Sequence, residues 1–341
     1  MRILCFTDNH FCERASIVAK HGDKYTLRLE NQLQSINWVE DTAIQKNCDA
    51  IICLGDFFDR AQLTDQELTA LQDITWSQLP HYFLVGNHES EENDLQYSST
   101  MALRGPNRFV IEQPTLLNFP DFEAAFLPYV VESNRQPMAD YFAPMSSKLR
   151  ILFSHNDIAG IQMGPVVSKT GFSIEELEGV CDCCFNGHLH NSHKVSNKIF
   201  NLGNLTGKDF SEDANIYAHR VLILDTATMQ LEFIENPYAF NFYKLELLTE
   251  ASLTVLNKLR SNAVLSIKCP VTLVAQIRES LMNIPNVIEF RIMAIQEASD
   301  TSEGEGIESL VVDQYAKFAE CCRLKLDNTQ LLEEELAEIL K

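Results

Sequence analysis

Oxygen and imidazole donors follow five short apolar segments of this sequence. The last segment leads into Gly187-His188-Leu189-His190, and the earlier four lead into Asp8-Asn9-His10, Gly55-Asp56, Gly86-Asn87-His88-Glu89 and Ser154-His155. The donors that can bind a hard or borderline metal ion are Asp8, His10, Asp56, Asn87, His155, His188 and His190. A set of carboxylates, imidazoles and one amide without a thiolate suits manganese, iron or zinc. It disfavours a closed structural zinc site made of cysteines.

Seven donors are too many for one such ion, and a carboxylate such as Asp56 can bridge two ions. Two divalent cations and the two carboxylates leave a formal charge of about +2, which suits a hydroxide and a phosphodiester anion. Two metals roughly 3.5–4 Å apart can generate the nucleophile and hold both oxygens of an in-line displacement. His88 need not be a ligand, because a neighbouring imidazole can protonate the leaving oxygen or stabilise the transition state.

Each group of donors stands at the end of a predicted strand. These strands cover 2–7, 50–54, 81–85, 150–153 and 183–185, and further strands are expected at 197–202, 219–225 and 229–235. Helices are predicted at 31–46, after Thr64 (with Glu67 completing a capping box) and near 173–179. Strands alternating with helices predict an α/β fold, in which ligands lie beyond the carboxyl ends of the strands. The five groups are therefore expected to converge on one site.

The chain is expected to contain more than one domain. Residues 1–237 carry all the metal-type motifs, whereas 238–295 read as a small α/β domain with strands at 242–248, 264–267 and 287–293 and helices at 251–260 and 271–283. Residues 296–308 have the composition of an acidic linker. Two amphipathic helices follow within 309–341, and this hairpin either folds back on the main body or docks on a partner.

Composition excludes several classes of protein. Of 341 residues, 45% are apolar and 22% charged, and no apolar run is long enough to cross a bilayer. We therefore expect a cytoplasmic protein that does not act in a membrane, with its ten cysteines reduced. Cys181 and Cys184 form a lone C-x-x-C that could be a redox pair or half of a zinc site. Because no second C-x-x-C is present, core packing is the preferred interpretation.

The net charge of −21 argues against unaided adhesion to nucleic acid or to an anionic membrane. An acidic protein that acts on a phosphate polyanion needs a metal, a local basic path or a partner that supplies positive charge. A loop predicted over 11–30 offers such a path, because it contains Arg14, Lys20, Lys24 and Arg28. These four side chains either contact a DNA backbone or belong to a solvated loop.

In order and spacing, the motifs resemble the signature of calcineurin-like metallophosphoesterases over roughly residues 1–235. They read Asp8-x-His10, Gly55-Asp56-x-x-Asp59, Gly86-Asn87-His88-Glu89, His155 and Gly187-His188-x-His190. The resemblance implies a four-layer α-β-β-α sandwich with His88 in the catalytic position. It also implies that one metal is bound by Asp8, His10, Asp56 and His190, and the other by Asp56, Asn87, His155 and His188. Glu89 stands where aspartate is commoner, at a position that is not a direct ligand.

Within that superfamily the chain is similar to SbcD-type recombination nuclease subunits, especially their phage branch. Motif II reads Gly-Asp-Phe-Phe-Asp, and a small α/β unit and terminal helices follow the catalytic part. The resemblance implies a DNA exo- and endonuclease with two Mn²⁺ ions and a capping domain. The C-terminal helices would bind an SMC-like coiled-coil ATPase, with a homodimer of nuclease subunits in a heterotetramer. Asp59 falls where some relatives have a histidine near the substrate, which makes it a candidate substrate contact.

Two other functions remain open at this point. The same metal site could hydrolyse a small-molecule phosphoester or a phosphoprotein, because the motifs recognise phosphate rather than the group attached to it. The extra domain and the terminal helices count against that function. A protein of another class, a non-catalytic scaffold, would act only through the C-terminal helices. Such a scaffold is expected to have lost metal ligands, whereas this sequence retains all seven.

Overall fold

A computed structural model describes residues 1–14, 17–18, 20–91, 95–163 and 166–295. The described residues up to Ile295 form one compact unit, Met1–Ile295. The predicted linker at 296–308 and the predicted helices within 309–341 lie outside the described residues and remain predictions.

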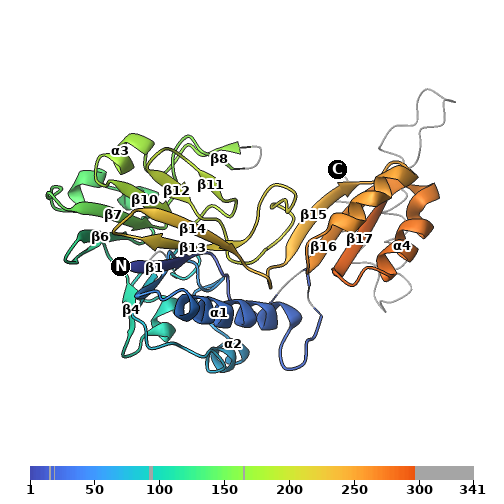
Figure 1. Cartoon of the computed structure of the whole chain (residues 1–341), viewed down its shortest axis with the longest axis horizontal. Coiled ribbons are helices and arrows are strands. Elements are labelled where there is room, and N and C mark those ends of the chain that lie inside the picture. The colour runs from blue at the N-terminus through green and yellow to red at the C-terminus, as the bar shows by residue number, and fades with distance from the viewer. Residues whose placement is uncertain (15–16, 19, 92–94, 164–165, 296–341) are drawn as a thin grey trace, which may run out of the picture. The chain divides into compact units, whose positions relative to one another are not determined.

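The first large sheet has six strands in the order β14-β13-β1-β2-β3-β4 (Figure 1). Strands β1 to β4 run parallel, β13 is antiparallel to β1, and β14 is antiparallel to β13. The strands are β1 (Arg2–Phe6), β2 (Ala50–Cys53), β3 (His81–Leu84), β4 (Arg108–Ile111), β13 (Arg220–Asp225) and β14 (Gln230–Glu235). The predicted strands of this sheet are confirmed.

The second large sheet also has six strands, in the order β11-β12-β10-β7-β6-β5. Its four central strands are parallel, and the two edge strands are antiparallel to their neighbours. The strands are β5 (Thr115–Asn118), β6 (Phe122–Leu127), β7 (Leu149–Ser154), β10 (Cys183–Asn186), β11 (His193–Lys194) and β12 (Ile199–Asn201). A separate hairpin pairs β8 (Gln162–Met163) with β9 (Val166–Val167).

Alternation along the strands assigns each face of a sheet to a layer. In β1, Leu4 and Phe6 pack in the cluster that includes α1 (Leu27–Gln45) and α2 (Asp65–Leu71), whereas Ile3 and Cys5 pack with residues of the second sheet. The outer face of the second sheet packs against α3 (Ile174–Glu178). The order of layers is therefore helix, sheet, sheet, helix, and the predicted α-β-β-α sandwich is confirmed (Figure 1).

A third, parallel sheet consists of β15 (Asn241–Glu246), β16 (Ala263–Pro270) and β17 (Val287–Ile295). Residues of α4 (Val274–Met282) pack with this sheet in a core cluster of their own. The helix predicted over 251–260 is present as Glu250–Lys258, but it is a 3-10 helix rather than an α-helix. These strands support a small α/β unit after residue 237, whose boundary as a domain remains a prediction.

Helix α1 starts earlier than the sequence suggested. Thr26 is its N-cap, and the Thr26 side chain accepts a hydrogen bond from the Leu29 amide at 3.3 Å. The predicted loop over 11–30 is therefore wrong from Leu27 onward, and Arg28 belongs to the helix. At α2 the predicted capping box between Thr64 and Glu67 is confirmed. Further 3-10 turns cover Ser99–Leu103, Glu132–Asn134, Met138–Asp140 and Val271–Leu273.

The eight cysteines in the described part of the chain are all free and buried. Cys181 and Cys184 lie in the core beside α3, and burial raises the pKa of the Cys181 thiol to about 12. A protonated thiol in an apolar core is a poor metal ligand and a poor nucleophile. The core-packing interpretation of this C-x-x-C pair is thus supported. Over the same residues, no helix is long and apolar enough to cross a membrane.

The layer between the two large sheets can be tested with a matched pair of phenylalanines. Phe153 is fully buried between the sheets, whereas Phe109 on edge strand β4 is 46% exposed and stacks on Tyr82. We predict that Phe153→Ala lowers the free energy of unfolding by about 3–5 kcal/mol. Phe109→Ala should cost only about 0.5–1.5 kcal/mol, the contribution of its aromatic contact. Urea unfolding monitored by the fluorescence of Trp38 and Trp76 measures both, and equal losses would contradict this layer assignment.

Candidate metal centre

The five predicted groups of donors converge where the parallel strands of both sheets end. Asp8 and His10 follow β1, Asp56 follows β2 and Asn87 follows β3 in the first sheet, while the remaining donors, His155, His188 and His190, follow β7 and β10 in the second. Three of the donors form one cluster, Asp8 with His10 and His190, and another three form a second, Asp56 with His155 and His188. The expected convergence is confirmed.

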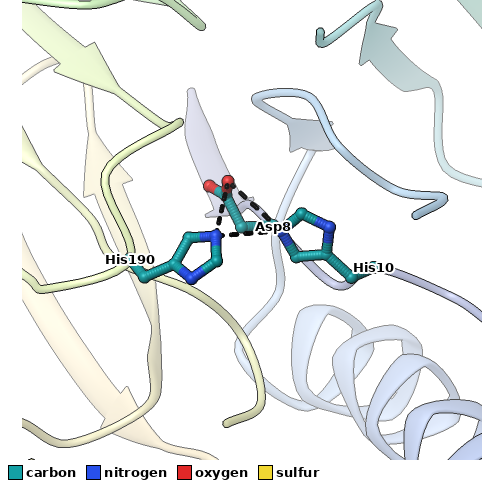
Figure 2. A group of neighbouring side chains, drawn as sticks. All are labelled: Asp8, His10 and His190. Atoms are coloured by element: carbon teal, nitrogen blue, oxygen red, sulfur yellow. Dashed lines mark hydrogen bonds and ion pairs between the residues drawn. The ribbon is translucent and has the colours of Figure 1, made fainter. Parts of the chain in front are cut away.

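In the first cluster, two imidazoles point their Nε2 atoms toward each other beside a carboxylate, with their ring planes inclined by 63° (Figure 2). The Nε2 atoms of His10 and His190 are 3.0 Å apart, and Asp8 Oδ1 lies 3.8 Å from the first and 3.9 Å from the second. Asp8 Oδ2 accepts hydrogen bonds from the Thr7 hydroxyl at 2.5 Å and from the His188 amide at 3.0 Å. Asp8 Oδ1, by contrast, is buried without a hydrogen-bond partner. Asp8 Oδ1 and the Nε2 atoms of His10 and His190 thus converge at one point, and Asp8 Oδ1 has no hydrogen-bond partner there.

The second cluster contains Asp56, His155, Asn87 and His188. His155 Nε2 lies 3.3 Å from Asp56 Oδ2 and 3.4 Å from Asn87 Oδ1. Asn87 Oδ1 is in turn 2.9 Å from His188 Nδ1. Carboxylate, amide and imidazole donors in one small space are an appropriate set for a divalent transition metal.

Asp56 joins the two clusters. Its Oδ2 atom lies 3.3 Å from His155 Nε2 and 4.0 Å from His10 Nε2, while Oδ1 accepts the His88 amide at 3.1 Å. One carboxylate oxygen therefore faces an imidazole of each cluster. This is the position that a bridging ligand between two ions would occupy.

Each histidine of the two clusters has an oxygen partner on its other ring nitrogen. His10 Nδ1 lies 3.0 Å from Asp59 Oδ1, His188 Nε2 lies 3.1 Å from Asp157 Oδ1, and His190 Nδ1 lies 3.3 Å from Glu212 Oε1. His155 Nδ1 lies 2.8 Å from the Leu54 carbonyl. Such partners select the tautomer in which the nitrogen that faces the centre would be free to bind a metal ion once it has no proton.

Asp157 and Glu212 were not predicted from the sequence. Asp157 follows His155 by two residues in the Ser-His-Asn-Asp run, which was a signal that could have found it. Glu212 lies in the segment between β12 and β13, where no periodic pattern marks it. It is nevertheless buried and accepts hydrogen bonds from Asn204 Nδ2 at 2.6 Å and from the Lys208 amide.

Asp59, predicted as a substrate contact, is engaged inside the site. Its Oδ1 atom lies 2.8 Å from Lys208 Nζ and 3.0 Å from His10 Nδ1. Burial opposes ionisation of Asp59, but the contacts with His10 and Lys208 lower its pKa below the usual range for a carboxyl group. Asp59 is thus placed to orient a histidine of the first cluster, and Lys208 is a second residue that the sequence did not reveal.

His88 is more open than the donors around it, with 35% of its side chain exposed. Its Nδ1 atom is 3.0 Å from the Asp59 carbonyl, and its ring packs edge-on against His10 with centroids 4.7 Å apart. Hydrogen bonding at Nδ1 leaves Nε2 available to a bound molecule. His88 also forms a group of potential metal donors with His10 and Asp56, so it adjoins both clusters, and its role beside the ligands remains a prediction.

The backbone around the centre is strained. Asp8, His10, Asp56 and His188 all have positive φ, between 48° and 74°. For residues other than glycine this conformation costs of order 1–3 kcal/mol each and is typical of functional sites. Close approach also restricts two motif glycines. A Cβ at Gly86 would lie 2.1 Å from Asp56 Oδ1, and one at Gly187 would lie 2.2 Å from Thr7 Oγ1.

The protonation of the centre reflects its concentrated negative charge. Burial lowers the pKa of His10 to about 4, so its imidazole is neutral at physiological pH. Burial would also lower the pKa of His155, but the carboxylates led by Asp56 raise it to about 9. Conversely, His155 lowers the pKa of Asp56 despite its burial. Bound divalent cations would take over the role of the His155 proton, so metal uptake should release protons.

Glu89 connects the motif that contains Asn87 with the motif that contains Asp56. It occupies the position at which aspartate is commoner in the family that the sequence resembles. Its carboxylate accepts hydrogen bonds from the Gly86 amide at 2.8 Å and the Phe58 amide at 3.0 Å, and the residue is fully buried. Burial and the neighbouring Asp56 raise the pKa of Glu89 to about 7. Glu89 therefore holds the third motif against the second and does not face the clusters as a donor.

The four predicted basic contacts do not form one patch of free cations. Arg28 is buried, and its guanidinium donates to the Lys208 carbonyl at 3.2 Å, so of its two predicted alternatives the solvated loop is wrong. Lys24 pairs with Asp73 at 2.7 Å, and Lys20 donates to the Ile288 carbonyl at 3.4 Å. For Arg14, the described contacts are between its main chain and Cys12. Contact of these residues with DNA remains a prediction.

The residues present fit divalent metal ions. The unpaired Asp8 Oδ1, the facing lone pairs of His10 and His190 and the anchored far nitrogens all favour a cation at this point. An unpaired buried carboxylate oxygen is costly unless a cation compensates it.

Comparison with known proteins yields a family and several individual likenesses. The family described as calcineurin-like phosphoesterase matches residues 1–192. A viral protein named "Putative phosphoesterase 244L", from Invertebrate iridescent virus 6, is 23% identical over 144 residues. That match covers 39% of this chain and 48% of the viral protein, about half its length.

Two solved structures are also similar. They are TT1561 of Thermus thermophilus (11% identity) and a dimetal phosphatase from Danio rerio (10% identity). Each match has a TM-score of 0.39 and covers 69% of this chain and 98% of the other. With TM-scores below 0.5, neither structure adds to the assignment.

Glu212, whose carboxylate contacts His190 Nδ1, provides a test of the metal centre. We predict that Glu212→Gln weakens Mn²⁺ binding by about 10- to 100-fold, because the His190 ring loses its anionic partner. Glu250→Gln, at an exposed position, is the control and should leave binding unchanged. Equilibrium dialysis with metal analysis measures both variants. Equal metal affinity in the Glu212 variant and the wild type would contradict this role for Glu212.

Proposed function

Since the chain belongs to the calcineurin-like phosphoesterase family, we propose that it is a metal-dependent DNA nuclease that hydrolyses phosphodiester bonds. The family assignment implies a hydrolase of phosphoesters that uses divalent metals. The finer proposal is an exo- and endonuclease with two Mn²⁺ ions, similar to SbcD-type recombination nuclease subunits.

The observation that carries a two-ion centre is the position of Asp56 between the two clusters. Its Oδ2 atom faces His155 Nε2 at 3.3 Å and His10 Nε2 at 4.0 Å. We propose that Asp8, His10, Asp56 and His190 hold one ion and that Asp56, Asn87, His155 and His188 hold the other. When bound, the two ions would supply Lewis acidity and lower the pKa of a water molecule that serves as the nucleophile.

The protein's own residues would perform the remaining steps. His88 is partly exposed beside both clusters, with its Nδ1 atom near the Asp59 carbonyl. Its Nε2 atom could therefore donate a proton to the leaving oxygen or stabilise negative charge in the transition state. Asp59, Asp157 and Glu212 would keep their histidine partners in the ligand tautomer.

DNA as substrate is a proposal that has to account for the acidity of the chain. At a net charge of −21, the protein does not attract DNA by itself. We propose that the metal ions, together with an SMC-like coiled-coil ATPase bound through residues 309–341, supply the positive charge that holds DNA. In this arrangement two nuclease subunits form a homodimer within a heterotetramer, and the unit at 238–295 caps the DNA.

The decisive experiment is a nuclease assay on linear duplex DNA with Mn²⁺, with and without the ATPase partner. An aryl phosphate monoester and a phosphoprotein are assayed in parallel. Cleavage of DNA, stimulated by the ATPase, supports the proposal. Efficient hydrolysis of the monoester or the phosphoprotein with no cleavage of DNA would overturn the nuclease assignment in favour of a phosphatase of the same family.

We predict that His88→Gln lowers the rate of phosphodiester cleavage by about 10²- to 10⁴-fold, the usual contribution of a positioned acid or base. The fold and the metal content should remain close to those of the wild type, because His88 is not among the proposed ligands. Metal analysis and circular dichroism of the same preparation are the controls. Full activity in a metal-loaded His88→Gln protein would remove this residue from the mechanism.

We also predict that a chain ending at residue 308 loses binding to the ATPase but still hydrolyses a simple aryl phosphodiester. The reason is that all proposed ligands lie before residue 191, whereas the predicted amphipathic helices lie within 309–341. Analytical ultracentrifugation of the mixture measures association, and a colorimetric assay measures hydrolysis. Undiminished association of the shortened chain would exclude docking through these helices.

A further inference from the structure

We propose that Lys208 is a further catalytic residue, which contacts a non-bridging oxygen of the phosphoryl group undergoing hydrolysis. The inference rests on phosphodiester hydrolysis at the proposed metal centre and does not require DNA to be the substrate. Lys208 belongs to the segment between β12 and β13, and none of the sequence motifs includes it.

The ammonium group of Lys208 lies at the edge of the first cluster. Its Nζ atom is 2.8 Å from Asp59 Oδ1 and 3.4 Å from His10 Nδ1. His10 Nδ1 is also 3.0 Å from the Asp59 carboxylate. In the tautomer that would leave Nε2 free for a metal ion, Nδ1 carries the proton and has no lone pair for Lys208. An ammonium group has three N–H donors, so donors remain beside the ion pair with Asp59. With 23% of the side chain exposed, a bound molecule can reach them.

The main chain of Lys208 is held from two sides. Its amide donates to both oxygens of Glu212 at 3.2 and 3.1 Å, and Glu212 also contacts His190 Nδ1 at 3.3 Å. Its carbonyl accepts from the buried Arg28 guanidinium at 3.2 Å. Lys208 is therefore tied to the same carboxylate that orients a proposed metal ligand. A lysine held in place in this way loses less conformational entropy when it binds an anion.

Asp59 places Lys208 and His88 on the same side of the centre. Its Oδ1 atom is 2.8 Å from Lys208 Nζ and 3.6 Å from His88 Nδ1, and both side chains are partly exposed. Beside His188, by contrast, lies the carboxylate of Asp157. On the first side the Lys208 ammonium balances the Asp59 carboxylate, whereas on the second side the Asp157 carboxylate has only an imidazole beside it, so a phosphate anion is repelled less from the first side. The geometry thus points to a phosphoryl group that faces Lys208 and His88.

An alternative role for Lys208 is to neutralise Asp59 without contacting the substrate. The two roles differ in a double-mutant cycle. If Lys208 acts only through Asp59, then Lys208→Met should have no further effect once Asp59 is Asn. If Lys208 contacts the phosphoryl group, the effect of Lys208→Met persists in the Asp59→Asn background, because the anion still loses its cationic partner.

The experiment uses the full chain saturated with Mn²⁺ and two probes. Calorimetry measures the Kd for inorganic phosphate, and an aryl phosphodiester gives kcat and KM. A hydrogen bond between two charged groups is worth roughly a 10- to 100-fold change in affinity. We expect Lys208→Met to raise the phosphate Kd and to lower kcat/KM by about that factor, with unchanged metal content. Lys208→Arg should retain most of the binding, because it keeps the charge and the donors.

Lys46, which caps the C-terminal end of α1, provides the matched control, because it is also ion-paired with a carboxylate, that of Glu232 in β14. Lys46→Met should leave the phosphate Kd and kcat/KM unchanged. An unchanged phosphate Kd in Lys208→Met, or loss of its effect in the Asp59→Asn background, would overturn the proposal. If the wild type does not cleave DNA but Lys208→Met still weakens phosphate binding, only the nuclease assignment is contradicted. The proposed role of Lys208 is then retained.

Discussion

The structure of this centre depends on negative charge buried between two sheets. Asp8 and Asp56 are almost completely removed from solvent, and Asp8 Oδ1 has no hydrogen-bond partner. A buried carboxylate oxygen in this state is stable only if a cation compensates it. The facing imidazoles of His10 and His190 complete the point at which such a cation would bind. The surrounding loops are best understood as the means of holding these donors together.

Several features of the fold hold the carboxylates and imidazoles of the centre close together. Four of the donors adopt positive φ, and two glycines allow the loops to approach within van der Waals distance. Backbone hydrogen bonds from Asp8 to Gly55 and from His10 to Asp56 join the first two motifs. Glu89 then joins the third motif to the second. Local strain is thus balanced by a dense network of hydrogen bonds, as expected for a site that is rigid before its ligand binds.

The charges around the centre are unevenly distributed. Lys208 and His88 lie beside Asp59, whereas Asp157 lies beside His188. An anionic substrate therefore meets a polarised site rather than a uniform one. Because the whole chain is strongly acidic, local cations and metal ions, not the net charge, must attract a phosphate group. The acidity of the chain is therefore the reason why both the local cations of the site and a DNA-binding partner are part of the proposal.

The sequence by itself determined the order of the buried strands and the donors that follow them. Apolar runs ending in Asp8, Asp56, Asn87, His155 and His188 were sufficient, because strand periodicity is local and ligands collect at the carboxyl ends of parallel strands. Tertiary structure alone decided the partners behind the ligands. Asp59, a candidate substrate contact in the sequence, lies 3.0 Å from His10 Nδ1. Arg28, predicted either to contact DNA or to belong to a solvated loop, is buried in α1. Glu212 and Lys208 had no periodic signal, because their roles depend on how an irregular segment folds back over the strand ends, and that path is set by long-range contacts.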